Sequence, residues 1–252
     1  MATIHLRSLS RSFPTQDGQP LPVLVDVDLT VRDRQFACLL GPSGCGKSTL
    51  LNIIAGLIPP SAGSIEFEGQ DPGSVNIGYI FQEPRLLNWR TVADNLDFAL
   101  RVKGVPRQER PAVVERYLKM VGLDQFKDAY PLTLSGGMQS RVGIARAFAI
   151  RPHVLLMDEP FSNLDELTAR QLRRDLLDLW EKERLTVLFI THNAMEAVYL
   201  GDVVHIMSHR PAEIFSSREV PLPRPRDYRN PEIFRLQQEI VDQLMARVGE
   251  LQ

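Results

Sequence analysis

The stretch FACLLGPSGCGKSTLLNIIAGL, residues 36–57, limits the possible folds more than any other part of the sequence. Its apolar run from Phe36 to Leu40 predicts a buried strand, and the apolar residues after Thr49 predict a buried helix. Between them, residues 41–48 follow the P-loop pattern Gly-x-x-x-x-Gly-Lys-Ser. Glycines let backbone N–H groups turn inward around an anion, and the following helix N-terminus adds partial positive charge. The stretch therefore predicts a phosphate-binding loop, with an ordinary glycine-rich turn as the less favoured alternative.

The side chains of this loop predict a nucleoside triphosphate as the bound anion. Lys47 should reach the β- and γ-phosphates, and the Ser48 hydroxyl should coordinate Mg²⁺. The residues expected to bind the nucleotide are Gly41, Pro42, Ser43, Gly44, Cys45, Gly46, Lys47, Ser48 and Thr49.

Composition excludes several other classes of protein. The chain has 252 residues, of which 44% are hydrophobic, enough for a sizeable core. The net charge of −2 gives no reason to expect binding to nucleic acid or to an anionic membrane surface. No apolar run approaches the roughly 18–20 residues that span a bilayer, so we expect a soluble chain. Cys38 and Cys45 do not have the spacing of a zinc site, which favours a reducing cytosol.

A second apolar run, in HVLLMDEP, ends in two adjacent carboxylates. The run from Val154 to Met157 predicts a strand that ends at Asp158, and Glu159 comes next. An acidic residue at the end of a strand is where P-loop enzymes hold Mg²⁺, which indicates this role for Asp158. Neighbouring side chains point different ways from an extended chain, so Glu159 can face an attacking water.

A third apolar run, in LTVLFITHNAME, predicts a strand over 186–190 that leads to His192. Parallel strands in such folds point their carboxyl ends at the ligand, which favours a binding role for this histidine over a structural one. Asn193 and Glu196 have the spacing of a capping box at the start of the next helix.

Five motifs together give the chain a resemblance to the ATP-binding-cassette (ABC) ATPases. They are GPSGCGKST, FQEPRLL, LSGGM, LLMDEPFSNLD and FITHN, in the family's order and approximate spacing. The resemblance runs from about residue 4 to residue 215. Within the family, three stretches look most like the nitrate, sulfonate and taurine import group: FQEPRLLNWRTVADNL, LSGGMQSRVGIARAFAIRP, and SHRPAEI with the Pro/Arg tail.

The resemblance implies a role for each matching residue. Phe13 would stack on adenine, with packing in the core as the alternative for a Phe near a strand end. Gln82 would contact both Mg²⁺ and the lytic water. Glu159 would be the general base, and His192 would contact the γ-phosphate. Asp165 would communicate across a dimer. The implied catalytic residues are Glu159, His192, Lys47 and Gln82, and the implied metal ligands are Ser48, Gln82 and Asp158.

The segment LSGGMQSR is consistent with two roles, a helix cap and a phosphate-binding site. Ser135 is well placed as the N-cap of a helix that carries Val142, Ala145 and Ala149. Gly136 and Gly137 leave backbone N–H groups open to a phosphate, whereas a plain helix cap does not explain two glycines in a first turn. By resemblance, these three residues would bind the γ-phosphate of ATP held by the other subunit. Met138 stands where the family more often has glutamine, which leaves the helix start open by one residue.

The resemblance also implies the fold. It is an α/β P-loop NTPase fold with a RecA-like core, an antiparallel strand layer near residues 2–35 and 62–80, and a helical subdomain near 85–150. The ATPase domain would cover 1–219, and 220–252 would hold a Pro/Arg linker and a C-terminal helix. The apolar stripe of that helix favours packing on its own domain, with a dimer or regulatory contact as the alternative. The stripe consists of Ile233, Leu236, Ile240, Leu244 and Val248.

These observations predict an ATP-hydrolysing motor that uses ATP and Mg²⁺ and drives a separate membrane permease. By resemblance, it would dimerise when ATP is bound, lie at the cytoplasmic face of the inner membrane, and act indirectly with a periplasmic or surface solute-binding protein. Nitrate, a sulfonate and taurine are the favoured solutes, and a pyrimidine precursor is an alternative. A soluble ABC ATPase acting on DNA or ribosomes is less favoured, because the sequence shows no long coiled-coil insertion, second cassette or basic stripe. A small-molecule kinase is also less favoured, because it would lack LSGGM and the histidine at 192 and would need an acceptor site.

Overall fold

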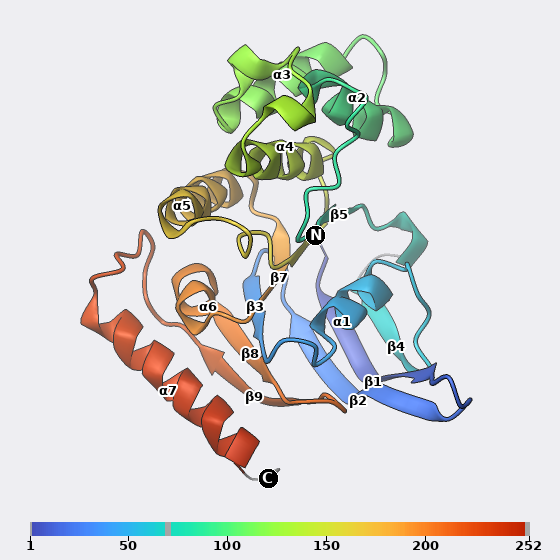
Figure 1. Cartoon of the computed structure of the whole chain (residues 1–252), viewed down its shortest axis with the longest axis vertical. Coiled ribbons are helices and arrows are strands. Elements are labelled where there is room, and N and C mark those ends of the chain that lie inside the picture. Colours follow the sequence, from blue (N-terminus) through green and yellow to red (C-terminus); the bar gives the residue numbers. More distant parts are fainter. Residues whose placement is uncertain (1, 69–71, 250–252) are drawn as a thin grey trace. The chain divides into compact units, whose positions relative to one another are not determined.

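The computed structural model describes residues 2–68 and 72–249. The chain divides into two compact units (Figure 1). Unit 1 comprises Met1–Val75 and Thr186–Gln252, and unit 2 comprises Asn76–Leu185. Unit 1 therefore contains the P-loop and both chain ends, and unit 2 is a single continuous insertion between them.

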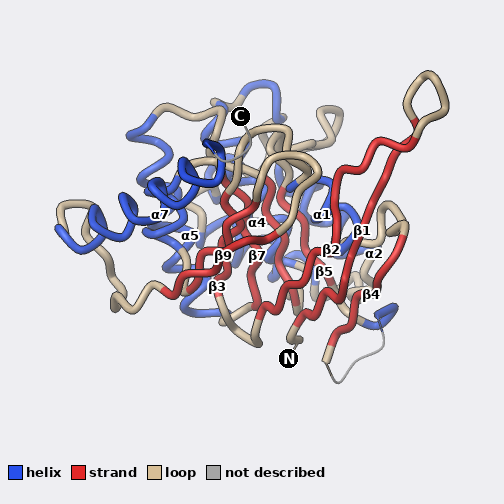
Figure 2. The backbone as a smooth tube through the Cα atoms, turned by 90° about the horizontal axis from the view of Figure 1, so that it is seen from below, coloured by secondary structure: helices blue, strands red, loops and turns tan. Residues whose placement is uncertain are grey.

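Unit 1 contains an antiparallel sheet in which β1 (Ile4–Pro14) lies between β2 (Pro20–Val31) and β4 (Ala62–Phe67). Alternate residues of β2, namely Val27, Leu29 and Val31, are buried, as expected for a sheet with one face on a core. Figure 2 shows β1 and β2 running out together as a long hairpin. The prediction of antiparallel strands is correct for 2–35 and for the first part of 62–80.

Unit 1 also contains a run of four strands that carries the P-loop. β3 (Phe36–Leu40) lies between β7 (Thr186–Thr191) and β8 (Val203–Met207), and all three are parallel and buried along their whole length. β9 (Ile214–Glu219) is antiparallel to β8. Continuous apolar runs are typical of parallel strands covered on both faces, which explains why these strands were visible in the sequence. Two helices follow them, α1 (Lys47–Ile54) and α6 (Ala194–Leu200).

The C-terminal segment packs on unit 1. The helix α7 (Pro231–Gly249) contacts α6, and it buries Ile233 and Ile240 completely. Leu236 and Leu244 are half-buried, and the side chain of Val248 lies outside the described residues. The described part of the stripe therefore packs on its own domain, the favoured of the two predicted arrangements.

Two arginines of the Pro/Arg segment form an arginine cap on the C-terminus of α6. The last carbonyl groups of a helix have no partner within it, and a cation near them is favourable. Arg226 is buried, and burial lowers its pKa to about 10, so its guanidinium stays charged at neutral pH. Nη1 of Arg226 donates to the carbonyl oxygens of Val198 (2.7 Å), Tyr199 (3.1 Å) and Gly201 (2.7 Å), and Arg224 donates to that of Leu200.

Unit 2 contains a parallel strand pair and a group of helices. β5 (Ile77–Ile80) pairs with β6 (Val154–Asp158), so residues 77–80 do not extend the antiparallel layer expected over 62–80. The apolar run that ends in Asp158 forms β6, and this buried strand is the parallel partner of residues 77–80. The helices α2 (Val92–Val102), α3 (Arg110–Met120) and α4 (Gly136–Ala149) pack on one another, and α5 (Glu166–Glu183) contacts α4. Short 3₁₀ turns occur at Pro72–Ser74 in unit 1 and at Asp124–Phe126 and Pro131–Thr133 in unit 2. Within the described part of the chain, no helix has both the length and the apolar character needed to cross a bilayer.

A buried histidine in β8 should make stability depend on pH. His205 is 7% exposed, its Nδ1 lies 2.7 Å from Ser217 Oγ, and burial lowers its pKa to about 4. The unfolded chain takes up this proton near pH 6.5, whereas the folded chain resists it until about pH 4. Stability should therefore fall by roughly 3 kcal/mol as pH decreases from 6.5 to 4.

Urea unfolding of the native chain and of His205→Asn across this pH range measures the effect. We expect the free energy of unfolding of the variant to depend less steeply on pH between 6.5 and 4, by nearly one bound proton. Its free energy of unfolding at pH 8 should change little by comparison. Identical slopes for the two proteins would show that His205 does not titrate in this way.

Candidate nucleotide-binding site

The P-loop connects β3 to α1 in unit 1. Gly44 and Gly46 have φ angles of 74° and 128°, a region that favours glycine. A Cβ on Gly46 would lie 2.9 Å from Cγ1 of Val23, so β2 also requires a glycine there. Gly46 is the N-cap of α1 and has no side chain to cap it. The loop thus has the backbone form and the helix end that bind phosphate.

The polar side chains of the loop lie where a nucleotide can meet them. Ser43, Gly44 and Ser48 are exposed, whereas Lys47 is only 4% exposed. Nζ of Lys47 donates to the carbonyl oxygens of Gly41 and Pro42, at 2.8 Å each. An ammonium group that bonds to carbonyls of its own loop is already positioned over the concavity, and phosphate oxygens can take the place of these acceptors.

His192 lies beside the P-loop because of strand register. In the parallel pair of β3 and β7, Leu40 is opposite Thr191, so the residues that follow them leave the sheet at the same edge. His192 is exposed there, between the end of β7 and the start of α6. Unit 1 therefore brings together the P-loop and the predicted γ-phosphate contact.

The predicted capping box after His192 is only half correct. The side chain of Asn193 accepts from the N–H groups of Met195 and Glu196, as an N-cap should. The N–H of Asn193 donates to Oγ1 of Thr191 at 2.9 Å, and this hydroxyl donates to the Glu196 carboxylate at 2.6 Å. A threonine hydroxyl thus stands between the two groups that a capping box would join directly.

Phe13 lies near the end of β1, opposite Leu21 of β2. The same hairpin touches the P-loop further along, where Val23 meets Gly46. Phe13 is half-buried, and the guanidinium carbon of Arg11 lies 4.6 Å from the centre of its ring. A cation over one face of a phenyl ring leaves the other face for a planar ligand. This geometry suits a stacking role, and sequence reasoning missed Arg11.

In unit 2, the predicted carboxylates come together with Gln82 at the carboxyl edge of the β5–β6 pair. Ile80 is opposite Met157, so the chain leaves β5 towards Gln82 at the same edge where β6 ends in Asp158. Glu159 has a φ of 43°, which is unusual for a residue with a side chain. Such a turn redirects the chain directly after Asp158, and backbone strain of this kind is often found at functional sites.

Ser162 links Gln82 to the turn at Glu159, a contact that sequence reasoning missed. The amide nitrogen of Gln82 donates to Ser162 Oγ at 3.1 Å, and this hydroxyl donates to the Glu159 carbonyl at 3.0 Å. The amide of Gln82 therefore presents its oxygen on the side away from Ser162. The serine of SNLD was the available signal, since hydroxyl groups commonly close turns of this kind.

The LSGGM segment caps a helix, as predicted. Ser135 is the exposed N-cap of α4, and its Oγ accepts from the N–H of Met138 at 3.3 Å. The helix begins at Gly136, which answers the question of its start. Gly137 has a second, unpredicted reason to be glycine, since a Cβ there would lie 2.7 Å from Cγ2 of Thr168 in α5.

Asp165 lies close to this segment as the N-cap of α5. Its Oδ1 accepts from the N–H of Thr168 at 3.0 Å, and this backbone hydrogen bond lowers the pKa of the carboxyl. Asp165 is exposed and charged at neutral pH. Unit 2 thus brings together the predicted signature residues and the predicted dimer-communication residue through the contact between Gly137 and Thr168.

Comparison with known proteins identifies the family. The family model described as ABC transporter matches residues 24–162, more than half of the chain. The chain belongs to the ABC transporter family. It is 46% identical over 205 residues to the taurine import ATP-binding protein TauB of Rhizobium johnstonii, covering 80% of this chain and 78% of that protein. It is 39% identical over 254 residues to the nitrate import ATP-binding protein NrtD of Synechococcus elongatus, covering 97% and 92%.

A solved structure supports the same assignment. The dimeric, post-hydrolysis structure of the ATP-binding cassette MJ0796, bound to ADP and Pi, matches with a TM-score of 0.75 and 28% identity, over 87% of this chain and 100% of that one. The predicted α/β P-loop NTPase fold is confirmed, and this ABC cassette is an ATPase.

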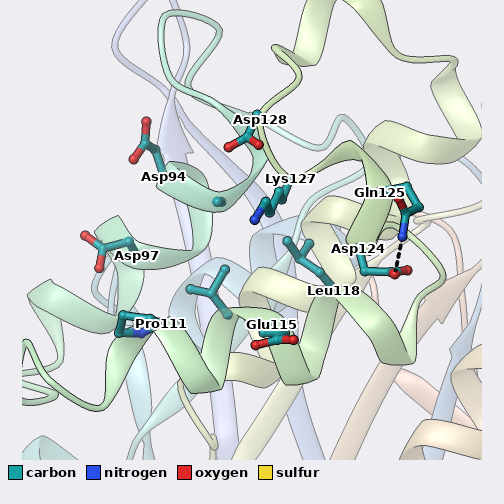
Figure 3. A pocket seen from close by; sticks show the side chains of 11 residues that line it. Asp94, Asp97, Pro111, Glu115, Leu118, Asp124, Gln125, Lys127 and Asp128 are labelled. Atoms are coloured by element: carbon teal, nitrogen blue, oxygen red, sulfur yellow. Dashed lines mark hydrogen bonds between the residues drawn. The ribbon is translucent and has the colours of Figure 1, made fainter.

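The helical part of this cassette contains a hollow that lies outside the predicted nucleotide site (Figure 3). It has a volume of about 630 Å³ and lies between α2, α3 and the turn after α3. Most of the charged residues that line it are carboxylates, so its negative charge would repel a nucleoside triphosphate. They are Asp94, Asp97, Glu115, Asp124 and Asp128, with Lys127 among them.

Proposed function

We propose that this cassette is the ATP-hydrolysing subunit of an importer for nitrate, a sulfonate, taurine or a related small solute. The observation that carries the proposal is the match to taurine and nitrate import ATP-binding proteins over most or nearly all of the chain. The register that sets the P-loop beside His192 supports the ATPase half of the proposal.

The chain's own residues supply binding, orientation and proton transfer. Lys47 and the amides of the P-loop hold the phosphates, and His192 contacts the γ-phosphate. Glu159 orients the attacking water and accepts its proton. Phe13 stacks on adenine. In this scheme the barrier is lowered by positioning and by fixed charges, with no covalent intermediate.

The donor set on the chain suits Mg²⁺. Small divalent cations of this kind prefer oxygen ligands, and the proposed ligands are the Ser48 hydroxyl, the Asp158 carboxylate and the Gln82 amide oxygen. Ser48 is exposed on the first turn of α1, and Gln82 is oriented by Ser162 with its oxygen outward. When bound, Mg²⁺ would neutralise phosphate charge, which lets the carboxylates of Asp158 and Glu159 stay ionised side by side.

Two copies of the chain are needed for each nucleotide in this proposal. Ser135, Gly136 and Gly137 of one copy bind the γ-phosphate of ATP held by the P-loop of the other, and Asp165 communicates between the two sites. The dimeric state of the matched cassette MJ0796 supports this arrangement. ATP would close the dimer, and hydrolysis would reopen it.

The energy of closure would be used by a separate permease at the cytoplasmic face of the inner membrane, to which the cassette binds peripherally. A solute-binding protein outside would deliver the cargo. Purification of the cassette with its membrane partner, followed by reconstitution in vesicles, tests the proposal. ATPase activity should rise with nitrate, taurine or an alkanesulfonate, and the responding solute identifies the cargo. A response to a pyrimidine precursor alone would favour the alternative cargo instead.

Three results would contradict the proposal. Activity that never responds to a membrane partner would indicate a soluble ABC ATPase. Phosphate found on a small acceptor instead of in solution would indicate a kinase. A response only to an unrelated cargo would leave the motor but overturn the solute class.

Lys47→Ala tests the P-loop itself. Removal of the ammonium group that lies over the loop should weaken ATP binding by about tenfold or more, the value of at least one charge-assisted hydrogen bond. Titration with a fluorescent ATP analogue measures the dissociation constant. An unchanged constant would count against the assignment of this loop.

A further inference from the structure

The turn between β8 and β9, residues 208–213, has no role in the proposed mechanism, yet it lies against the P-loop. The turn is closed on itself, because the N–H of Ser208 donates to the Glu213 carbonyl at 3.0 Å and the N–H of Glu213 donates to Ser208 Oγ at 3.1 Å. Arg247 of α7 donates to the Glu213 carboxylate and ties the turn to the C-terminal helix. The turn is therefore a fixed element of unit 1.

The turn and the end of β8 contact the P-loop from outside. At the start of the loop, a Cβ on Gly41 would lie 3.0 Å from the Met207 carbonyl oxygen. In the middle, Nη2 of Arg210 donates to the Gly44 carbonyl at 2.9 Å. Of these contacts, the one from Arg210 is a charge-assisted hydrogen bond to a loop whose own function is to bind an anion.

The turn also acts on the last glycine of the loop through β2. The N–H of Ala212 donates to the Val23 carbonyl at 2.9 Å, and the N–H of Val25 donates to the Ala212 carbonyl at 3.1 Å. Val23 in turn packs against Gly46, where a Cβ would lie 2.9 Å away. The turn and the two strands bonded to it, β8 and β2, thus contact the P-loop at its beginning, middle and end.

The bond from Arg210 sets the direction of one loop amide. In a trans peptide the C=O and the next N–H point in opposite directions. Because Arg210 holds the Gly44 carbonyl outward, the N–H of Cys45 must point into the loop, and it is directed there at the Pro42 carbonyl, 3.4 Å away. Gly44 has a φ of 74° and little steric restraint of its own, so the shorter bond from Arg210 adds to the long hydrogen bond between Cys45 and Pro42 in opposing rotation of this peptide.

We propose that Arg210 is a positioning residue for nucleotide binding: it holds the Gly44–Cys45 peptide with its N–H toward the phosphate concavity. The proposal rests on the proposed function, in which a nucleotide occupies the P-loop. Arg210 acts on the loop that surrounds the β-phosphate, so it should affect ATP and ADP alike.

Arg210→Ala in the full chain tests this role. The dissociation constants of ATP and of ADP should both rise by about three- to tenfold, the value of one hydrogen bond, while kcat at saturating ATP stays within about twofold. Since Arg210 is exposed, the thermal midpoint without nucleotide should not change. Arg210→Lys, which keeps a charged donor, should recover part of the affinity. Arg32→Ala, which changes another exposed arginine of unit 1, is the matched control.

Four outcomes would overturn the inference. The first is weaker binding of ATP but not of ADP, which would place Arg210 on the γ-phosphate, and the second is an equal effect of Arg32→Ala. The third is a thermal midpoint, measured without nucleotide, that falls enough to account for the lost affinity. The fourth is unchanged nucleotide affinity in the Arg210 variant while Lys47→Ala still weakens ATP binding. The last outcome would leave the proposed function intact. Unchanged affinities in both variants would instead contradict the P-loop assignment, and with it the proposed function.

Discussion

Replacement of Glu159 by Gln is expected to leave ATP binding intact while turnover falls by about 10²–10⁴-fold, the usual contribution of a general base. Glutamine has the same shape as glutamate but cannot accept the proton of the attacking water. The backbone turn at Glu159, with its φ of 43°, is held by Ser162 through the main-chain carbonyl, so the substitution should not disturb it. ATP should then accumulate in closed dimers.

Phosphate release and size-exclusion chromatography with light scattering measure the two parts of this expectation. Glu181→Gln, an exposed glutamate on α5, controls for the loss of one negative charge. Turnover within a few-fold of the native rate would remove Glu159 from the role of base. Slow turnover without dimers would show that closure, and not proton transfer, requires the carboxylate.

Replacement of Ser135 by Arg should abolish ATP-dependent dimerisation and reduce hydrolysis by about 100-fold or more, as loss of a preorganised phosphate contact does. The monomer should still bind ATP with its native affinity, because its P-loop belongs to unit 1 and is unchanged. Ser135 is exposed, so the larger side chain can be accommodated in the monomer and would obstruct only the approach of a partner.

Two further variants at this position separate dimer closure from helix capping. Ser135→Ala removes the hydrogen bond to Met138 and should cost about 1 kcal/mol of stability. Ser135→Asn keeps a good cap and should restore that stability. Two results would contradict the contact across the dimer. One is loss of ATP binding by the monomeric arginine variant. The other is a rate of hydrolysis that follows stability across the Arg, Ala and Asn variants.

The predictions that proved correct rest on signals carried by neighbouring residues. The predicted runs at 36–40, 154–157 and 186–190 are continuous apolar stretches, which a buried parallel strand needs and few other short segments show, and they lie in the strands β3, β6 and β7. The cap at Ser135 is equally local, since the hydroxyl bonds to an amide three residues later. The roles assigned to the site residues and the domain limits remain predictions.

The features that were missed depend on partners far apart in the chain. Residues 77–80 read as one more strand of a layer, and only their pairing with β6 decides the sheet to which they belong. Gly137 is restricted by Thr168, Gln82 is oriented by Ser162, and Arg210 reaches back to Gly44. Each side chain has many possible partners, and no local pattern selects among them.

The arginine cap on α6 also limits which C-terminal segments can be exchanged between members of this family by recombination. Arg224 and Arg226 supply donors to the carbonyl oxygens of residues 198–201, so these carbonyl groups at the end of the helix depend on the tail for their hydrogen bonds. A chimera that takes its tail from a relative with different residues at these two positions would bury carbonyl groups without donors at the end of the helix that begins next to His192. Recombination between relatives should therefore preserve α6 and the tail as a single inherited block.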